Sequence, residues 1–395
     1  MKVSYTLGLA SWAAGAVVPT HFSNSTSHKA LYFLENNPAG ANIVAVKVSS
    51  QDGTLSDPVR TPTGGKGLIG LNSQGQAAVD TLFSQDAVVV SGNYLLTVNP
   101  GSNTVSLFTI PASDPYHPVP VGGPVYSGGD FPNTVAYSAP RGLACVANSG
   151  ARSTVQCFAV TPTGLHPVGG ARMPLPLANQ TTPPLGPPNT VSDIVFNPEG
   201  TALFVSVKGT AGDPGYLYAY EVVDSNSTTF GAAVNPEAHV SRPAELDMNF
   251  SLTFLGSGAR AFVSDPGFGG AFVDVGRDLR ASVSRPINVT GQAASCWSQY
   301  SEQFGAVYVF DGGVVDVTVL DAETMDARPK LMGPAAAGGK FDSAVAGKYL
   351  YTLDGAASIT AYSLRESRVL QTLDLSKFGN RQFFQGLAFY GDTSR

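Results

Sequence analysis

The sequence predicts an all-β fold: a seven-bladed β-propeller with four antiparallel strands per blade and a ring closed by the C-terminal strand. One pattern, an apolar run, a polar or Gly-rich turn and a second apolar run, occurs seven times along the chain. Another short strand precedes each hairpin after the first, and another follows. A surplus strand stands at the C-terminus, while the first hairpin lacks its preceding strand. Strand-only repeats of this size are typical of propellers.

The N-terminus has the features of a secretory signal peptide. Residues 1–16, MKVSYTLGLASWAAGA, carry one Lys, then an uncharged run, and end in a small-x-small cleavage pattern. A buried N-terminal strand is the alternative. No other segment approaches the ~20 apolar residues of a membrane helix. We therefore expect a signal peptide over 1–16, a segment over 17–27 and a single propeller over 28–395.

Five Asn-X-Ser/Thr sequons accompany the signal peptide. They are Asn24, Asn179, Asn226, Asn249 and Asn288. Together with the leader they predict a glycoprotein that is secreted or resides in the lumen of the secretory pathway.

The seven hairpins have turns spaced by about 45 to 60 residues. The turns begin at Asn36, Asn99, Asn148, Lys208, Asp265, Asp311 and Asp354. Preceding strands are expected at 87–92, 133–138, 192–197, 251–256 and 343–347, with alternation of larger apolar residues and Ser or Thr within the hairpins.

The two ends of the chain explain each other. The first hairpin begins near Ala30 without a preceding strand, and FQGLAFYG, residues 384–391, has no hairpin after it. If this last strand joins the first hairpin, both ends complete one blade and the ring has no open edge. Two β-sandwiches, the alternative, would not explain the orphan strand.

Two of the three cysteines lie in one predicted hairpin. Cys145 and Cys157 are equidistant from Ala151 in the turn, so they would face each other on neighbouring strands. An oxidising compartment would allow a disulfide; two buried thiols are the alternative. Cys296 is then the odd cysteine, which we expect to be packed rather than nucleophilic.

Composition excludes several classes of function. The net charge is −6 and only 13% of residues are charged, so nucleic acid is not an expected partner. No Ser/His/Asp arrangement, HExxH motif or phosphate-binding loop is present. Two Pro-rich connections, 111–132 and 174–188, are long enough to form part of a ligand site or to cover a sheet edge.

Two units of the sequence resemble blades of a known family. FPNTVAYSAPRGLACVANSG and PPNTVSDIVFNPEGTALFVSVKG look like blades of lactonase-type propellers. The whole chain after the signal peptide is similar to secreted fungal proteins described as carboxymuconate-cyclase-like. The resemblance implies three activities: carboxymuconate lactonization, a cell-surface antigen role, or hetero-Diels–Alder chemistry in tropolone–sesquiterpene biosynthesis.

The lactonizing relatives use a His with Arg and Glu near the channel mouth. Here two innermost strands begin with Asn-Thr, at Asn133 and Asn189. The five His residues are His21, His28, His117, His166 and His239. This departure, and few cations near strand starts, disfavour a highly anionic substrate.

Residues at the starts of the innermost strands should line the channel mouth. Carboxylates there could be general acids or bases, amides could bind a tropolone oxygen, and aromatic rings suit a planar substrate. The candidate catalytic residues are Asp193, Asp247 and Asp342. The candidate substrate-binding residues are Asn133, Asn189, Trp297, Tyr300, Lys340, Phe384 and Gln385. Each could instead be a turn former or a core residue.

These features lead to one functional hypothesis and two alternatives. The hypothesis is a cyclase that dehydrates a hydroxymethyl-tropolone to an o-quinone methide and guides its [4+2] cycloaddition to a humulene-type sesquiterpene. It needs no cofactor and no metal, although a ring of Asn and Asp could bind Ca²⁺. Its expected partners are small hydrophobic molecules, without nucleic acid or a membrane span, and pairing of two copies is left open. The alternatives are a non-catalytic glycan or protein binder and a lactone-forming or lactone-hydrolysing enzyme.

Overall fold

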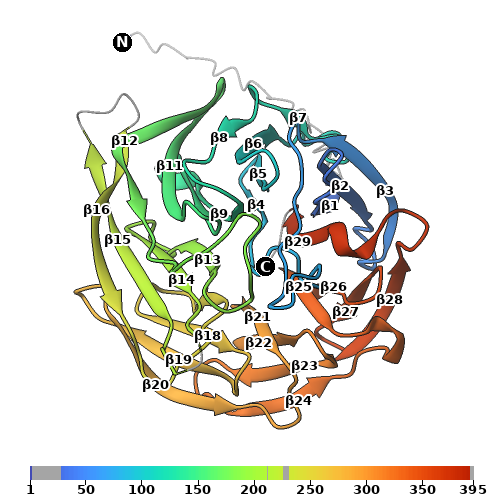
Figure 1. Ribbon diagram of the computed structural model, residues 1–395. Coiled ribbons are helices and arrows are strands. Elements are labelled where there is room, and N and C mark those ends of the chain that lie inside the picture. The colour runs from blue at the N-terminus through green and yellow to red at the C-terminus, as the bar shows by residue number, and fades with distance from the viewer. Residues whose placement is uncertain (2–27, 211, 226–230, 392–395) are drawn as a thin grey trace.

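The computed structural model describes residues 1, 28–210, 212–225 and 231–391. These residues form seven antiparallel sheets around a central axis, with four strand positions in radial order; in one sheet two short strands share the outermost position (Figure 1). The predicted seven-bladed propeller is therefore confirmed. The predicted signal peptide apart from Met1, the predicted segment 17–27 and the sequons at Asn24 and Asn226 lie outside the described residues.

The strands follow the repeats of the sequence, from the channel outwards in each blade. Blade 1 contains β29 (Phe384–Tyr390), β1 (Lys29–Glu35), β2 (Asn42–Val48) and β3 (Leu55–Pro62). Blade 2 contains β4 (Val88–Ser91), β5 (Tyr94–Asn99), β6 (Thr104–Thr109) and an outer edge split into β7 (Val119–Pro120) and β8 (Val125–Tyr126). Blade 3 contains β9 (Pro132–Ser138), β10 (Leu143–Asn148), β11 (Thr154–Thr161) and β12 (Gly164–Pro174).

The remaining four blades keep the same order. Blade 4 contains β13 (Val191–Phe196), β14 (Ala202–Val207), β15 (Tyr216–Ser225) and β16 (Gly231–Ser241). Blade 5 contains β17 (Leu252–Phe254), β18 (Arg260–Asp265), β19 (Gly269–Val275) and β20 (Ala281–Asn288). Blade 6 contains β21 (Ser295–Ser301), β22 (Ala306–Asp311), β23 (Val314–Asp321) and β24 (Ala327–Leu331). Blade 7 contains β25 (Lys340–Ala346), β26 (Tyr349–Asp354), β27 (Ser358–Ser363) and β28 (Arg368–Asp374). Three short 3₁₀ turns are Ala139–Arg141, Ala335–Ala337 and Arg381–Phe383.

The ring closes as the orphan strand predicts. The C-terminal β29 pairs antiparallel with β1, from Ala30 opposite Tyr390 to Glu35 opposite Phe384. Blade 1 therefore takes its innermost strand from one end of the chain and its other strands from the opposite end. The closure pairs the inner edge of β1, which would otherwise be open.

The hairpin cysteines form the predicted disulfide. Cys145 and Cys157 are directly opposed in the β10–β11 ladder, their Cα atoms are 4.0 Å apart and their sulfur atoms are bonded. Cys296 is the free cysteine of the described chain and is buried, and this burial raises the pKa of its thiol well above the usual range. Both observations agree with the predicted disulfide and the predicted packed thiol.

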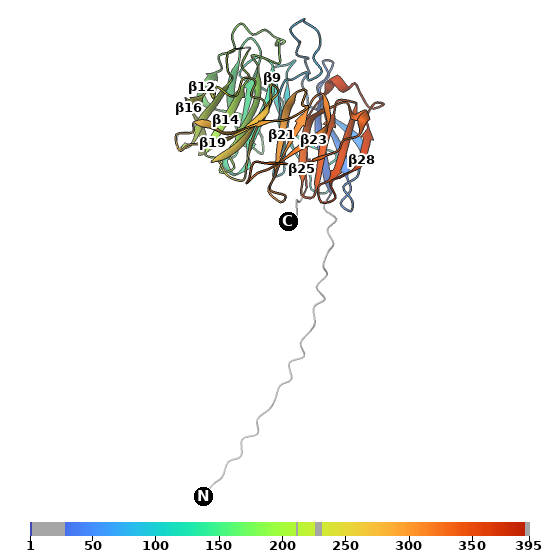
Figure 2. The same cartoon turned by 90° about the horizontal axis from the view of Figure 1, so that it is seen from below.

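The propeller has two distinct faces. The loop face carries the hairpin turns that begin at Asn36 and its six equivalents, and also the connections between blades. The termini face is the opposite one, where β1 begins and β29 ends. Figure 2 shows blue and green connections rising above the ring on the loop face. Apolar side chains of neighbouring sheets pack between the blades, so the core surrounds the channel as a ring of clusters.

Candidate active site in the central channel

The connection from β3 to β4, residues 63–87, is the longest between two described strands, and its last part crosses the channel. We call Asp80–Ala87 the channel segment. Figure 1 shows this blue connection entering the middle of the ring. Long connections inside compact folds are commonly functional, and this one brings two carboxylates, Asp80 and Asp86, to the channel.

Side chains of three other blades hold the channel segment by its carbonyl groups. Asn133 Nδ2 donates to the carbonyl of Leu82 at 3.1 Å, and Lys208 Nζ donates to that of Phe83 at 2.6 Å. Trp297 Nε1 donates to the carbonyl of Ser84 at 3.2 Å. The segment therefore closes the channel towards the loop face.

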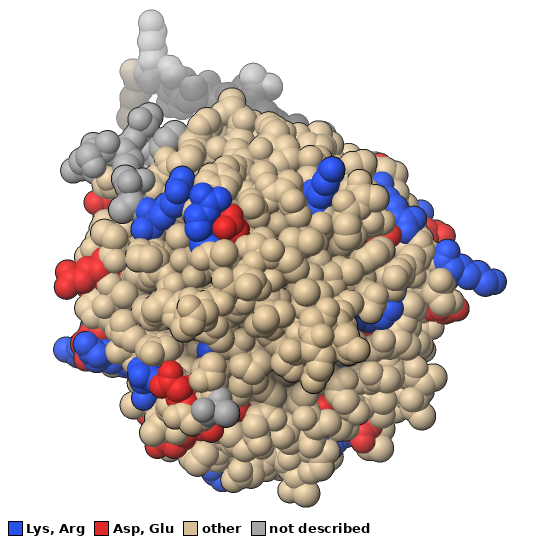
Figure 3. Space-filling model, in the orientation of Figure 1, with Lys and Arg blue, Asp and Glu red and all other residues tan. Residues whose placement is uncertain are grey.

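The middle of the loop face is uncharged in Figure 3, and Lys, Arg, Asp and Glu gather nearer its rim. The connection 175–190 lies over the channel segment: Leu185 bridges to Leu71, and Gly186 lies against the ring of Phe83. The Pro-rich segment 174–188 thus helps to close the channel. The other Pro-rich segment instead supplies β7 and β8 at the edge of blade 2. Its prolines lack the N–H groups that a continuous strand would need.

Three carboxyl groups interact electrostatically at the channel: Asp86, at the end of the channel segment, and Asp193 and Asp342, from β13 and β25. Asp193 and Asp342 are 0% and 3% exposed, whereas Asp86 is half-buried. Burial raises the pKa of each, to about 7 for Asp86, and the charge of Asp86 further raises the pKa of Asp193 and of Asp342. We call Asp86, Asp193 and Asp342 the carboxyl cluster. Like charges repel, so Asp193 and Asp342 bind a proton more readily than isolated carboxyl groups do.

Each buried carboxyl of the cluster keeps one oxygen available. Asp193 Oδ2 accepts from the Leu252 amide at 2.8 Å, and Asp342 Oδ1 accepts from the Ser343 amide at 2.8 Å. Asp193 Oδ1, Asp342 Oδ2 and the nearby Asn133 Oδ1 have no partner among the described residues. Unpartnered buried oxygens are costly, so they are candidates for contact with a ligand or a proton.

Lys208 is an exception in the repeat. The equivalent turn residues of the other six blades are Asn or Asp, and their buried side chains bind nearby loops and strands. Lys208 is 2% exposed and donates to Phe83 and, at 3.1 Å, to Thr190 Oγ1. Burial lowers the pKa of Lys208 to about 7, and burial raises the pKa of the facing Asp80 to about 6. An amine in this state can exchange protons near neutral pH.

An aromatic array borders these charges. The ring of Trp297 packs against Phe250 and Phe341 with centroid distances of 5.1 and 5.0 Å. Lys208 lies 4.3 Å above the centroid of Phe250, and Arg381 lies 4.7 Å from that of Phe341. Cation–π contacts of this kind partly offset the desolvation of buried cations.

Four of the predicted site residues meet at this place. They are Asn133, Asp193, Trp297 and Asp342, which come from blades 3, 4, 6 and 7. One extra residue interrupts the pairing near the start of several innermost strands, for example Asn133 and Ser192. Bulges of this kind redirect the neighbouring side chains.

The other predicted residues lie elsewhere. Asp247 is exposed on a loop. Asn189 binds the amide and carbonyl of Ala178 and so supports a turn. Phe384 packs against Phe33 at 4.9 Å within blade 1, and Gln385 is 5% exposed in the same strand.

Lys340 is committed to a structural ion pair. Its ammonium group lies 2.6 Å from Asp354 Oδ1, and both side chains are 0% exposed. The position of Lys340 at the start of β25 does not by itself distinguish an ion-paired lysine from a substrate-binding one. The difference depends on Asp354, which lies at the turn of the neighbouring hairpin.

Sequence reasoning missed Asp80, Asp86, Lys208 and Arg381. Two signals were available: the length of the 63–87 connection, and the Lys at a position where six repeats have Asn or Asp. Burial lowers the pKa of Arg381 to about 10, with opposing effects of Asp80, Asp354 and Asp342.

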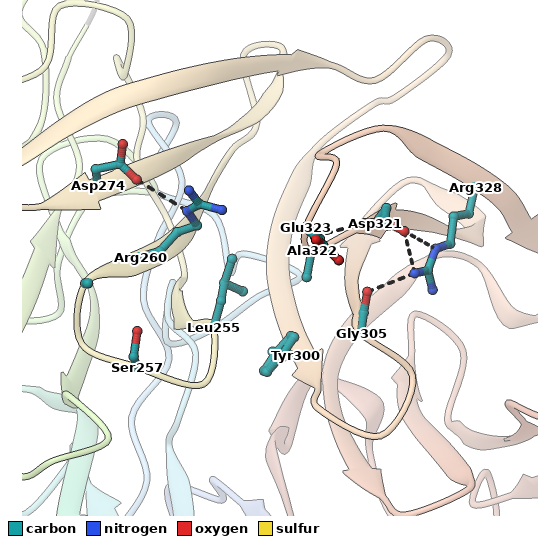
Figure 4. Close-up of a pocket in the computed structure, with 11 residues that line it drawn as sticks. Leu255, Ser257, Arg260, Asp274, Tyr300, Gly305, Asp321, Ala322, Glu323 and Arg328 are labelled. Atoms are coloured by element: carbon teal, nitrogen blue, oxygen red, sulfur yellow. Dashed lines mark hydrogen bonds and ion pairs between the residues drawn. The ribbon is translucent and has the colours of Figure 1, made fainter.

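Tyr300 lies on the termini face, away from the carboxyl cluster. It borders two adjoining hollows of about 730 and 590 Å³ between blades 5, 6 and 7. Figure 4 shows Tyr300 between the Arg260–Asp274 and Arg328–Asp321 ion pairs. We call the two hollows together the Tyr300 groove.

The described sequons differ in accessibility. Asn179 and Asn288 are exposed. Asn249 is 1% exposed, and its Nδ2 donates to Ser206 Oγ and the Tyr216 carbonyl. A glycan on this nitrogen does not fit the folded chain, because the same atom is used in the core.

Two searches of the described residues concern ligands and membranes. In residues 28–210, 212–225 and 231–391, no group of three or more His, Cys, Asp or Glu is arranged to hold a metal ion. In the same part of the chain, no helix is sufficiently long and apolar to span a membrane.

Comparison with known proteins shows the fold alone. No family model matches the chain, and no curated protein matches its sequence. A candidate 6-phosphogluconolactonase from Bacteroides fragilis is similar over 93% of this chain and 99% of its own, with a TM-score of 0.62 and 13% identity. A protein from Lactobacillus plantarum has a TM-score of 0.60 and 16% identity over 93% and 100% of the two chains. A protein of unknown function from Desulfotomaculum acetoxidans has a TM-score of 0.59 and 11% identity over 92% and 99%. The chain therefore shares its seven-bladed β-propeller fold with these structures, to which it is only distantly similar.

Proposed function

We propose that this chain is a small-molecule cyclase of the hetero-Diels–Alderase type that works in its central channel. It promotes loss of water from a hydroxymethyl-tropolone and guides [4+2] cycloaddition of the resulting o-quinone methide to a humulene-type sesquiterpene. The observation that carries the proposal is the carboxyl cluster, in which Asp193 and Asp342 each keep an unpartnered buried oxygen. This observation supports acid–base chemistry at the channel, and the resemblance described above supplies the substrate class.

The cluster suits a dehydration because its carboxyl groups hold protons at neutral pH. Burial raises the pKa of Asp193 and of Asp342 well above the usual range. A neutral carboxylic acid can protonate a departing hydroxyl group, and its conjugate base can then remove the proton of the ring hydroxyl. Cycloaddition itself needs orientation more than a chemical group, and an enclosed site can provide orientation.

The described histidines do not favour lactonization of the kind used by the muconate relatives. His166 and His239 lie on the outermost strands β12 and β16, and His117 is exposed beside Asp114. His28 precedes β1 on the termini face. Chemistry at the carboxyl cluster would therefore proceed without a histidine base from these positions.

The test is incubation of the purified glycoprotein with a hydroxymethyl-tropolone and a humulene alcohol, with products separated by chiral chromatography. We expect a stereochemically enriched dihydropyran adduct, formed faster than with boiled protein. The double variant Asp193→Asn/Asp342→Asn should lose at least about 100-fold in rate. Asp247→Asn, on an exposed loop, is the matched control and should react as the wild type does. A racemic background with folded wild-type protein would reject the proposal.

A second candidate function is binding of a neutral glycan at the Tyr300 groove. The groove combines one aromatic ring with ion pairs whose free donors and acceptors can bind hydroxyl groups. We would measure binding to a glycan array for the wild type and for Tyr300→Ala. Specific binding that Tyr300→Ala abolishes, combined with no adduct, would make this the leading function.

A further inference from the structure

A cavity on the termini face leads to the carboxyl cluster. It has a volume of about 320 Å³ and lies between the innermost strands of blades 2, 3 and 4. Its walls combine apolar side chains, among them Val89, Val90 and Phe196, with polar ones such as Ser138 and Asn197. The carboxyl group in this lining is that of Asp86. Small-molecule sites are concave and combine apolar walls with a few placed polar groups.

Asp86 differs from the other two cluster members in its access to solvent. Asp193 and Asp342 are almost completely buried, whereas Asp86 keeps accessible surface although protein surrounds it closely. Its backbone has a positive φ of 60°, which is uncommon for a residue other than glycine. Such conformations are often found at functional sites. Here the positive φ lies where the channel segment turns into β4, which begins at Val88.

The opposite approach to the cluster is closed. Leu82, Phe83 and Ser84 are bound to three blades through their carbonyl groups, and Leu82 and Phe83 are 0% and 1% exposed. A ligand coming from the loop face would have to displace these contacts. A ligand coming from the termini face meets Asp86 first.

We propose that the Asp86 cavity is the substrate site, that it is reached from the termini face, and that Asp86 is the proton donor that contacts the substrate. This inference rests on the proposed function and assigns its reacting acid. Asp193 and Asp342 act through Asp86 and are therefore positioning residues.

The dehydration balances with one carboxyl group. The protonated Asp86 gives its proton to the hydroxyl of the hydroxymethyl group, the carbon–oxygen bond breaks, and water leaves with the bonding electrons. The substrate is then a cation, and its ring hydroxyl gives a proton to the Asp86 carboxylate. The products are a neutral o-quinone methide and water, and Asp86 is protonated again.

Burial favours the acidic form of Asp86. Asp193 and Asp342 face it from β13 and β25, and Lys208, which interacts with Asp193, lies on the loop side of the cluster. Desolvation raises the pKa of Asp86 to about 7. We expect the dehydration rate to fall as pH rises through this value, because the donor loses its proton.

The size of the cavity limits what it holds. A volume of about 320 Å³ is near the lower end of the range for small-molecule pockets. It suits one planar ring system rather than a ring and a sesquiterpene together. We place the tropolone in the cavity and the macrocycle at its mouth, near Pro140 and Pro198.

The binding experiment uses tropolone itself as the probe, titrated into the full glycosylated chain and followed by calorimetry. Val90→Trp, which fills the cavity, should weaken binding at least about 10-fold. Ser257→Trp, in the Tyr300 groove, is the matched control and should bind tropolone as the wild type does. Equal affinities of Val90→Trp and the wild type would overturn the cavity assignment.

The kinetic experiment compares Asp86→Asn with the wild type. Asp86→Asn should bind tropolone with nearly unchanged affinity but dehydrate a hydroxymethyl-tropolone about 100-fold or more slowly. The protonation of Asp193 is coupled to that of Asp86. Asp193→Asn should therefore shift the pH at which the rate falls, which a merely structural role would not cause. An unchanged rate in Asp86→Asn would overturn the assignment of the donor.

A spectroscopic measurement on wild-type protein tests the contact with Asp86 even if the variants fold poorly. In wild-type protein, infrared difference spectra with and without tropolone should show a perturbed band of a protonated carboxyl group, and Asp86→Asn should lack it. An unperturbed band at saturating tropolone would overturn the contact with Asp86. Absence of any adduct with wild type would instead reject the proposed function, and this inference with it. Adduct formation that survives both Val90→Trp and Asp86→Asn would reject this inference alone.

Discussion

Lys208 and Lys340 are both buried lysines beside the same channel, yet their surroundings differ. Lys340 forms an ion pair with Asp354, whose carboxylate also accepts hydrogen bonds from Thr352, Ser358 and Thr360. Lys208 donates to the carbonyl of Phe83 and to Thr190. The carboxyl group that faces it is that of Asp80, and the pKa of this carboxyl is raised. One lysine is neutralised by its own blade, and the other belongs to a group that shares protons.

This difference separates structural from functional charge. A buried pair with satisfied hydrogen bonds joins strands and has no capacity left for a ligand. A buried amine among carboxyls of raised pKa keeps its protonation state adjustable. Residue type and burial are the same for both lysines, so the distinction lies in the partners.

The largest expected effect on stability is that of Lys340→Met. This substitution leaves Asp354 buried without its cation, which should lower the free energy of unfolding by about 3–5 kcal/mol. Urea denaturation measures the change. The double variant Lys340→Met/Asp354→Asn should recover part of the loss, and full additivity of the two single variants would contradict a coupled pair.

A smaller effect on stability is expected for Lys208→Met. Loss of its hydrogen bonds costs about 1 kcal/mol each, and removal of a buried amine offsets part of that cost. The free energy of unfolding should therefore change by about 1 kcal/mol. A loss of stability equal to that of Lys340→Met would remove the distinction between the two lysines.

The pH dependence of stability should reveal the proton-sharing group. Asp80 and Asp86 have folded pKa values of about 6 and about 7, above the unfolded value. The folded chain therefore binds more protons between about pH 4 and 7, and stability should fall as pH rises through this window. Lys208, with a folded pKa of about 7, binds fewer protons than in the unfolded chain from about pH 7 to 10, so its contribution rises there.

Urea denaturation between pH 4 and 10 should accordingly show a minimum near neutral pH. Asp86→Asn should reduce the fall in stability on the acidic side of this minimum. Lys208→Met should reduce the rise in stability on its alkaline side. A monotonic curve that neither substitution alters would contradict the assigned pKa directions.

The smallest effect is expected at an exposed ion pair. Arg285 and Asp326 lie 2.7 Å apart, with side chains that are 45% and 64% exposed. Arg285→Ala should change the free energy of unfolding by less than about 1 kcal/mol, and added salt should reduce even that difference. A change as large as that of Lys340→Met would show that burial does not account for the contrast.

Parts of the candidate site could be predicted because they repeat. Asn133, Asp193, Trp297 and Asp342 stand at or near the starts of innermost strands, and strand starts can be located once the repeat is recognised. Asp247 and Asn189 follow the same rule but lie on loops outside the channel. The position of a residue in the repeat predicts that it lies near the start of an innermost strand. The surrounding loops decide whether its side chain faces the channel.

The sequence by itself determined the blade number, the four-strand pattern, the ring closure by β29 and the Cys145–Cys157 disulfide. The blade number, the strand pattern and the disulfide follow from local periodicity and from pairing within hairpins, which depend on residues close together along the chain. Ring closure follows from the strand count, because the surplus strand at the C-terminus matches the strand missing before the first hairpin. Only the tertiary structure decided that the connection 63–87 crosses the channel and that Asp80 and Asp86 join Asp193, Asp342 and Lys208. These groups are far apart in sequence, and their pKa values depend on the burial and the charges that the closed ring imposes on them.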